Sequence, residues 1–285
     1  MTSSIDTGRH PLEARGADIG YGGEPIVRDL DLVVEAGRIT ALVGPNGCGK
    51  STVLRALARL LPAARGTILL DGADIASMSS REVARRLGIL PQEPVAPSGI
   101  TVAELVWRGR HPHRRIGQRP TRADEIAIAE ALVRTGTAAL AERPVESLSG
   151  GQRQRVWIAM ALAQQTGILL LDEPTSYLDV AHQLEVLDLL TDLRDAGTTV
   201  LMVLHDLGQA ARYADTVVAM REGRVVTSGP VREVVTAELL RDVFGVTARV
   251  IEDPDTGAPL VLVRGRHDLA PPCEPTPMSP EGAHP

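Results

Sequence analysis

Residues 39–52 read ITALVGPNGCGKST. Residues 39–43 form an unbroken apolar run, which predicts a strand that is buried on both faces. Residues 44–52 follow with the spacing G-x-x-x-x-G-K-[ST], and the sequence beyond the motif predicts a helix over 51–61. A loop of this spacing between a strand and a helix is typical of a phosphate-binding site. The stretch therefore predicts a phosphate loop in an α/β protein.

The residues of this loop suit a bound anion for separate physical reasons. Its glycines allow successive N–H groups to point into one concavity, and the helix N-terminus adds a charge of about +0.5. Lys50 is the one lysine among 30 basic residues, and its compact ammonium fits between two phosphates better than a planar Arg does. The loop residues expected to bind the nucleotide are Gly44, Asn46, Gly47, Cys48, Gly49, Lys50, Ser51 and Thr52.

Two adjacent carboxylates end a second predicted strand. Residues 168–171 are apolar, and Asp172 and Glu173 follow them. Because ligands gather at the carboxyl ends of parallel strands, we expect this pair at the same edge as the phosphate loop. Adjacent residues of a strand point to opposite sides. We therefore assign Asp172, with the Ser51 hydroxyl, to Mg²⁺, and Glu173 to the attacking water as its general base.

Apolar runs alternate with amphipathic stretches along most of the chain, which is α/β patterning. A third buried strand is expected over 198–204. Two sets of apolar residues have the spacing of one helix face. They are Val83 with Leu87, behind a capping box at 79–82, and Val180 with Leu184 and Leu187.

Other segments differ from this pattern. Residues 94–147 lack a strand signal but contain helical stretches such as 123–134, which predicts a mainly helical insertion. Residues 1–13 are polar and predict a flexible lead-in. Residues 266–285 include six prolines and predict a disordered tail.

Composition excludes several classes of protein. The chain has 285 residues, enough for one or two domains with a sizeable core. A net charge of −6, with two Trp, three Tyr and one Phe, disfavours a nucleic-acid partner. The longest apolar run, 156–163, is much shorter than the ~20 residues of a membrane span, and the N-terminus has no signal-peptide core. Cys48 and Cys273 form no disulfide or zinc framework, which fits a reducing cytoplasm.

Residues 148–152, LSGGQ, precede a helical stretch at 153–164. A hydroxyl, two glycines and exposed N–H groups make this a second helix N-terminus that is ready for an anion. A chain with one phosphate loop does not need a second anion site for its own nucleotide. The motif therefore makes sense if it caps a nucleotide held by another copy. Together with the phosphate loop and the LLLDEP strand, LSGGQ resembles the ATP-binding subunit of an ATP-binding cassette (ABC) transporter. The resemblance covers roughly residues 12–265.

The resemblance brings further residues into the expected site. Tyr21 stands where the family places an aromatic ring against adenine. Gln92 matches the glutamine that contacts Mg²⁺ and links to the transmembrane subunit, and His205 matches the histidine that contacts the γ-phosphate. Asp179 matches the loop that crosses the dimer interface, whereas Tyr177 stands where the family commonly has a small residue.

The resemblance also implies an architecture. We expect a P-loop NTPase core with a mainly parallel sheet, an N-terminal antiparallel β part and an inserted α-helical subdomain. The core would comprise 14–93 and 148–265, and the insertion 94–147. The implied assembly is a head-to-tail homodimer that holds two Mg-ATP molecules between its copies and hydrolyses them. Each ATP would meet Lys50, Ser51, Gln92, Asp172, Glu173 and His205 of one chain and Ser149, Gly150 and Gly151 of the other.

Three stretches, at 90–93 with 101–112, at 175–183 and at 203–215, resemble the ferric-siderophore, haem and vitamin B12 importers. Ferric-siderophore import is the first choice, and haem, vitamin B12 and divalent-metal (Mn or Zn) importers stay open. A soluble, non-transport ABC ATPase is the alternative from another class. An importer implies separate transmembrane permease subunits, an extracytoplasmic substrate-binding protein as an indirect partner, and a place at the cytoplasmic face of the membrane.

Cys48 lies inside the expected phosphate loop and permits two interpretations. A helix N-terminus can lower the pKa of a thiol, which would make this cysteine reactive and sensitive to ATP. The interpretation that we favour is a passive small residue.

Overall fold

A central sheet of six strands organises the chain. The computed structural model describes residues 10–114 and 119–265, so the expectations for 1–9 and for the tail at 266–285 lie outside the described residues. The strand order in this sheet is β10-β9-β3-β8-β7-β6, and all pairs are parallel except β9 with β10. The strands are β3 (Ile39–Val43), β6 (Leu87–Leu90), β7 (Ile168–Asp172), β8 (Thr199–Val203), β9 (Thr216–Arg221) and β10 (Arg224–Pro230).

The three strands expected from apolar runs are confirmed to within one residue at each end. All five residues of β3 are buried, because hydrophobic clusters cover both faces of the central sheet. Ile39 belongs to the cluster on the side of α5 (Gly150–Ala163) and α6 (Val180–Asp195). Leu42 belongs to the cluster on the side of α1 (Lys50–Leu57). Strands covered on both sides have no polar face, which is why these runs lack alternation.

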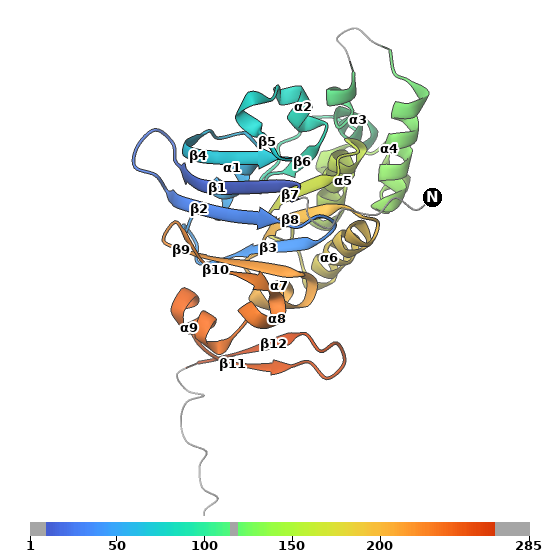
Figure 1. Cartoon of the computed structure of the whole chain (residues 1–285). Helices are drawn as coiled ribbons and strands as arrows, with labels where there is room; N and C mark the ends of the chain where they lie inside the picture. Colours follow the sequence, from blue (N-terminus) through green and yellow to red (C-terminus); the bar gives the residue numbers. More distant parts are fainter. Residues whose placement is uncertain (1–9, 115–118, 266–285) are drawn as a thin grey trace, which may run out of the picture.

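A second, antiparallel sheet lies against the first through β2 and β10 (Figure 1). Its strands, in the order β2-β1-β4-β5, are β1 (Leu12–Ile19), β2 (Val27–Val34), β4 (Ala63–Leu70) and β5 (Ala73–Asp74). The expectation that residues up to 13 form a flexible lead-in is wrong at its end, because β1 starts at Leu12 and the Leu12 side chain is completely buried. The expected antiparallel β part is thus present.

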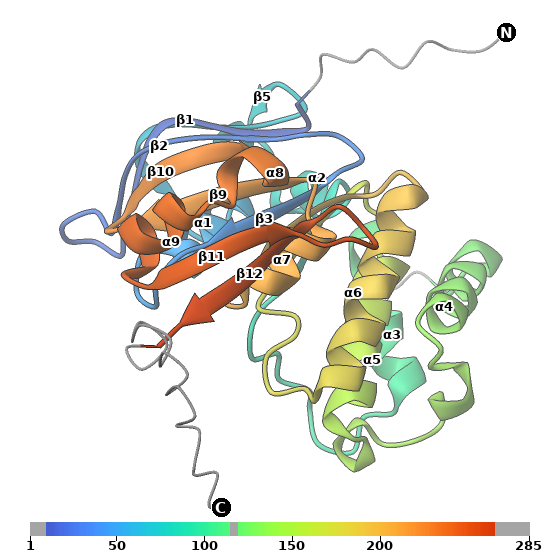
Figure 2. The same ribbon diagram turned by 90° about the horizontal axis from the view of Figure 1, so that it is seen from below.

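The helices lie on the two faces of the central sheet and beside it (Figures 1 and 2). They are α1, α2 (Ser80–Ala84), α3 (Val102–Arg108), α4 (Arg122–Arg134), α5, α6, α7 (Leu207–Tyr213), α8 (Val231–Val234) and α9 (Ala237–Phe244), with 3-10 turns η1 (Ile75–Ser77), η2 (His111–His113), η3 (Ala138–Leu140) and η4 (Val145–Ser147). A hairpin of β11 (Thr247–Glu252) and β12 (Pro259–Arg264) packs on α7 and α9.

Several helix expectations need correction. Helix α1 ends at Leu57 rather than at residue 61, because Arg59 takes a left-handed conformation with φ of 58°. The capping box at Ser79 is confirmed, but α2 is only five residues long and Leu87 belongs to β6, where it pairs with Ile168. Its burial reflects strand pairing and not a helix face.

The expected apolar stripe of α6 is wrong in its first turns. Val180 and Leu184 are 72% and 38% exposed, respectively. The buried face lies further along the helix, since only its later turns pack on the core. It comprises Val186, Leu187, Leu189, Leu190 and Leu193.

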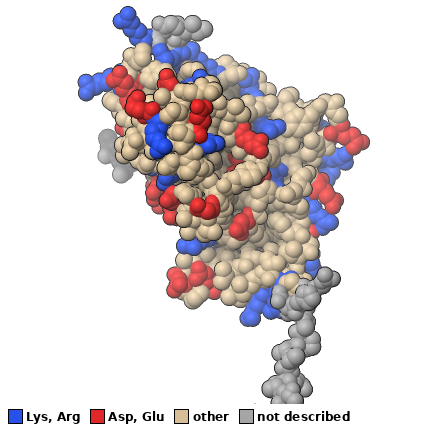
Figure 3. Space-filling model, turned by 180° about the vertical axis from the view of Figure 1, so that it is seen from behind, with Lys and Arg blue, Asp and Glu red and all other residues tan. Residues whose placement is uncertain are grey.

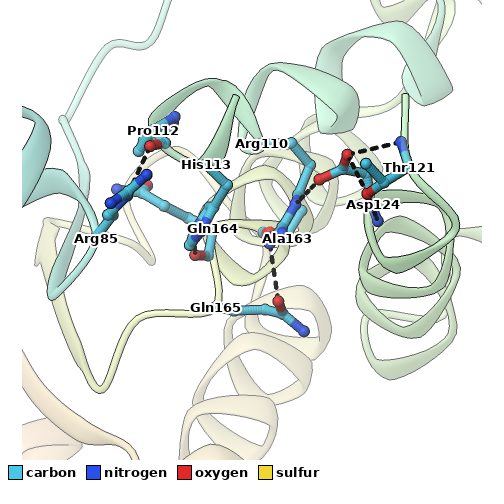
Figure 4. Close-up of polar contacts among 9 residues, drawn as sticks. All are labelled: Arg85, Arg110, Pro112, His113, Thr121, Asp124, Ala163, Gln164 and Gln165. Carbon is cyan, nitrogen blue, oxygen red and sulfur yellow. Dashed lines mark hydrogen bonds and ion pairs between the residues drawn. The ribbon is translucent and has the colours of Figure 1, made fainter. Parts of the chain in front are cut away.

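Helices α3 and α4, which lie between residues 94 and 147, pack on α5 (Figure 2). Figure 4 shows the polar contacts between this part and the end of α5. Arg110 is buried, and its guanidinium donates to Asp124 Oδ1 at 2.9 Å, to the carbonyl of Ala163 at 2.8 Å and to Gln165 Oε1 at 2.9 Å. The His113 ring contacts the carbonyl of Gln164 at 2.7 Å. The division into a core and an insertion at 94–147 stays an interpretation.

The surface of the molecule carries charged side chains of both signs (Figure 3). On the face shown in Figure 3, basic side chains are interspersed with acidic ones. In the part of the chain that the structure describes, no helix combines the length and the apolar character that crossing a membrane requires.

Candidate nucleotide-binding site

The phosphate loop connects the end of β3 to the start of α1, as the motif predicts. Gly44, Gly47 and Gly49 have φ values of 152°, 78° and 104°, a region that favours glycine. A Cβ at Gly44 would lie 2.2 Å from the carbonyl oxygen of Met220 in β9, so no side chain fits there. Lys50 is 5% exposed, and its ammonium donates to the carbonyls of Gly44 at 2.8 Å and of Pro45 at 3.0 Å. The loop is thereby held in the curved form that an anion nest needs.

Asp172 is the last residue of β7, and it lies next to the start of α1. The Ser51 hydroxyl donates a 2.9 Å hydrogen bond to Asp172 Oδ1. Burial raises the pKa of Asp172 above its ordinary value; the Ser51 hydrogen bond opposes that rise and the neighbouring Glu173 adds to it. The hydroxyl and the carboxylate predicted to hold Mg²⁺ are therefore adjacent, as oxygen ligands for one cation must be.

Glu173 has left the strand. Its φ of 54° is left-handed, so the different directions of Asp172 and Glu173 come from this turn and not from strand alternation, which corrects the sequence argument. Oε2 of Glu173 accepts hydrogen bonds from Gln92 Nε2 at 2.6 Å and from the Ser176 hydroxyl at 2.9 Å. Oε1 contacts Nε2 of His205. Three polar side chains thus hold the carboxylate in one orientation.

A cleft of about 450 Å³ joins these groups at the carboxyl ends of β3, β8, β7 and β6. Its lining residues are Ile26, Asn46, Gly47, Gly49, Lys50, Ser51, Thr52, Gln92, Glu173 and His205. All except Ile26 belong to the expected site. Ile26 precedes β2 and carries no motif, so only its place in the fold reveals it. Ser176, whose hydroxyl donates to Glu173, was also not predicted from the sequence, although it lies three residues beyond that carboxylate.

Other expected site residues lie outside the lining of this cleft. The Tyr21 side chain is 57% exposed, and its hydroxyl accepts a 3.1 Å hydrogen bond from Arg55. Its contact with adenine stays a prediction. Gly44 and Asp172 lie behind Lys50 and Ser51, respectively, to which they are hydrogen-bonded.

Cys48 is buried among the apolar side chains on the α1 side of the central sheet. Burial raises the pKa of its thiol, and the effect of Lys50 in the opposite direction is smaller. Burial therefore opposes an activated thiol, and a passive small residue stays the favoured interpretation of Cys48.

The LSGGQ residues form the N-terminus of α5, away from the cleft of the same chain. The helix starts at Gly150, earlier than expected, and Ser149 is its N-cap. Ser149 Oγ accepts from the backbone N–H of Gln152 at 3.3 Å, while the Ser149 N–H donates to Gln152 Oε1 at 3.2 Å. Asp179 is the N-cap of α6 and accepts from the N–H of His182 at 2.9 Å, without the reciprocal bond that Ser149 has.

Comparisons with known proteins agree with this geometry. The family model described as ABC transporter matches residues 27–176. The ferric enterobactin transport ATP-binding protein FepC of Escherichia coli (strain K12) is 50% identical over 267 residues, 93% of this chain and 97% of that protein. The iron(3+)-hydroxamate import ATP-binding protein FhuC of Bacillus subtilis (strain 168) is 51% identical over 88% of this chain and 94% of that protein.

A solved structure gives the same result for the fold. The dimeric structure of MJ0796, a bacterial ABC transporter cassette, matches with a TM-score of 0.68 at 26% identity, over 78% of this chain and 99% of that chain. The matches to these relatives extend over most of the sequence. They agree with the phosphate loop, the acidic strand end, the LSGGQ helix and the overall architecture. The chain belongs to the ABC transporter family, as an ATP-binding and ATP-hydrolysing member.

Proposed function

We propose that this chain is the ATP-hydrolysing subunit of an importer that takes up a ferric siderophore. One observation carries the hydrolytic role: Lys50, Gln92, Glu173 and His205 line a single cleft. The choice of a ferric siderophore is supported by relatives that are named for ferric enterobactin and iron(3+)-hydroxamate and share about half of their residues with this chain.

The cleft suits the phosphates of ATP. The loop at 44–52 offers backbone N–H groups and the Lys50 ammonium to the β- and γ-phosphates, and Tyr21 would meet the adenine ring. Ser51, Asp172 and Gln92 offer oxygen atoms that would hold Mg²⁺. Within residues 10–114 and 119–265, no group of three or more His, Cys, Asp or Glu side chains could hold a metal. In nucleotide sites Mg²⁺ is commonly held by one or two carboxylates together with substrate phosphates. When bound, Mg²⁺ supplies charge neutralisation at the β- and γ-phosphates.

Glu173 is the proposed general base. Its carboxylate is held ready for the proton of the attacking water, because Gln92, Ser176 and His205 fix its two oxygens. His205 lines the same cleft and would contact the γ-phosphate. When Mg-ATP binds, we expect His205 to exchange its contact with Oε1 of Glu173 for the γ-phosphate, which leaves Oε1 for the attacking water. Gln92 would keep its Nε2 contact with Oε2 and offer its own amide oxygen to the metal.

The active form is proposed to be a head-to-tail homodimer. Ser149, Gly150 and Gly151 do not line the cleft of their own chain, so the α5 N-terminus is free to face the nucleotide of a second copy. The likeness to a dimeric cassette supports this arrangement. Asp179 would lie at the same interface. ATP binding would close the dimer, and hydrolysis would open it.

Transport would need other subunits. We propose that separate permease subunits cross the membrane and hold this chain at its cytoplasmic face, with Gln92 as the link. An extracytoplasmic substrate-binding protein would deliver the cargo and contact this chain only indirectly. We expect no nucleic-acid partner.

Uptake of radiolabelled ferric siderophore by iron-starved source cells tests the proposal. Cells that carry Glu173→Gln in place of the native chain should lose uptake, while manganese and zinc uptake continue. Unchanged siderophore uptake with the variant present at normal levels would contradict this cargo. Parallel measurements with haem, vitamin B12 and divalent metals would then identify an alternative importer. Unchanged transport of all of them would favour a soluble ABC ATPase.

A further inference from the structure

His182 lies between two segments of the proposed dimer interface. We name residues 176–179 the interface loop and residues 148–152 the signature turn. His182 belongs to the first turn of α6, directly after the interface loop. Its ring contacts Asp179 on one side and Gly151 on the other. It lies in the stretch 175–183 but has no assigned role there, and it does not line the cleft.

The contact with Asp179 is doubled. Oδ1 of Asp179 accepts from the backbone N–H of His182 at 2.9 Å and from ring atom Nδ1 at 2.7 Å. The hydrogen bond from the His182 backbone is also the main cause that lowers the pKa of Asp179, so the carboxylate is ionised and only accepts. Nδ1 must therefore carry the proton. The ring orientation follows from Asp179, and the Asp179 side chain is fixed in return.

The contact with Gly151 is very close. A Cβ placed on Gly151 would lie 2.2 Å from Cδ2 and 2.5 Å from Cγ of His182, so the ring occupies the space that a side chain at 151 would need. The neighbouring Gly150 meets the interface loop in the same region, since a Cβ there would lie 3.8 Å from Leu178. The signature turn therefore packs directly on the interface loop and on His182.

We infer that His182 is a positioning residue that couples the interface loop to the signature turn within one chain. This inference rests on the proposed function, in which both segments reach the nucleotide site of the partner. The two segments stand at the starts of different helices, α5 and α6, and are not adjacent in sequence. The His182 ring is hydrogen-bonded to the interface loop and packed on the signature turn. The two segments therefore take up their interface positions together.

ATP-driven dimerisation of the full chain tests this role. The parent is Glu173→Gln, in which slow hydrolysis should let the ATP-bound dimer accumulate. Light scattering over a series of protein concentrations with Mg-ATP gives the concentration for half-dimerisation. Adding His182→Ala should raise it about tenfold, as expected for a coupled pair of contacts. Binding of a fluorescent ATP analogue to the monomer should be unchanged, because His182 does not line the cleft.

Two further variants separate positioning from general loosening. His182→Asn keeps a donor where Nδ1 lies and an atom where Cδ2 lies, so it should restore most of the dimerisation. The matched control is Glu185→Ala, which removes the 2.7 Å ion pair between Arg155 of α5 and Glu185 of α6. It loosens the same two helices without touching Asp179 or Gly151, and should change dimerisation by less than about twofold.

The outcomes distinguish this inference from the function on which it rests. Parent-like dimerisation of His182→Ala, or an equal loss in Glu185→Ala, would overturn the role of His182 alone. A parent that stays monomeric with Mg-ATP would overturn both this role and the proposed dimer. Thermal unfolding without nucleotide verifies folding; if His182→Ala fails to fold, the comparison of His182→Asn and Glu185→Ala with the parent decides.

Discussion

Gln92 donates a 2.6 Å hydrogen bond from Nε2 to Oε2 of Glu173, across 81 positions of sequence. Gln92 lies two residues beyond the end of β6, and Glu173 directly follows β7. These strands are neighbours in the central sheet, with β8 and His205 beyond them. The proposed base is thus held by a residue from each neighbouring strand end.

Replacing Glu173 with Gln should lower ATP turnover about 10²–10⁴-fold, because the amide cannot take a proton from water. Mg-ATP binding should persist, since the phosphate loop is untouched. Phosphate release and binding of a fluorescent ATP analogue measure the two effects. Glu142→Gln, an exposed change on the surface, is the matched control and should retain full turnover. Full turnover in Glu173→Gln would remove this residue from the base role.

Alanine at the two signature glycines should have different effects on stability. Gly151→Ala must displace the His182 ring, which Asp179 holds in place, and should lower the free energy of unfolding by about 1–3 kcal/mol. Gly150→Ala places its Cβ at an ordinary contact distance and should leave stability unchanged or raise it by about 0.4–1 kcal/mol. Urea unfolding of the nucleotide-free chain measures both. Equal losses would contradict the close contact with His182.

Asp124 should make stability depend on acid pH. Burial alone would raise the pKa of Asp124, but the hydrogen bonds from Thr121 and from Arg110 outweigh it and lower the pKa from 3.8 to about 2. A lowered pKa in the folded state means that the carboxylate stabilises the protein above about pH 4. That stabilisation is lost as the pH falls toward 2.

Asp124→Asn should therefore destabilise the protein at pH 7 by about 2 kcal/mol or more, since it leaves the buried Arg110 without its counter-ion. The difference from the native chain should shrink between pH 4 and pH 2, as urea unfolding across this range would reveal. Asp195→Asn removes an exposed partner of Arg194 and serves as control. A stability difference that does not vary with pH would argue against ionised Asp124 as its source.

Cys48 should react slowly with maleimide in the folded protein. Its thiol is buried and burial raises its pKa, so little thiolate exists near pH 7.5. Labelling is measured in a Cys273→Ser background, because Cys273 lies outside the described residues and would otherwise contribute. Urea should accelerate the labelling strongly, and ATP should have little effect. Fast labelling of the native chain that ATP suppresses would contradict this assignment.

The elements expected from local signals were confirmed where one face or both faces of the element are covered along its length. Strands β3, β7 and β8 are buried on both sides, so their apolar runs mark them directly. The predicted end of α1 was wrong, because a left-handed residue, Arg59, follows the helix. The predicted buried face of α6 was wrong, because the edge of the core determines which turns of this helix are covered. Leu87 is apolar on either interpretation, and only its pairing with β7 assigns it to a strand.

The parts of the site that are contiguous in the chain follow from local patterns of residues. The phosphate loop is nine residues whose glycines, lysine and flanking elements act locally, and the caps at Ser149 and Asp179 are equally local. Only the tertiary structure decided which side chains meet across strands and helices. Parallel pairing brings Gln92, Glu173 and His205 to one edge, and the packing of α5 on α6 puts His182 against Gly151. These contacts join residues tens of positions apart, and their geometry follows from sheet register and helix packing, which no local pattern of residues encodes.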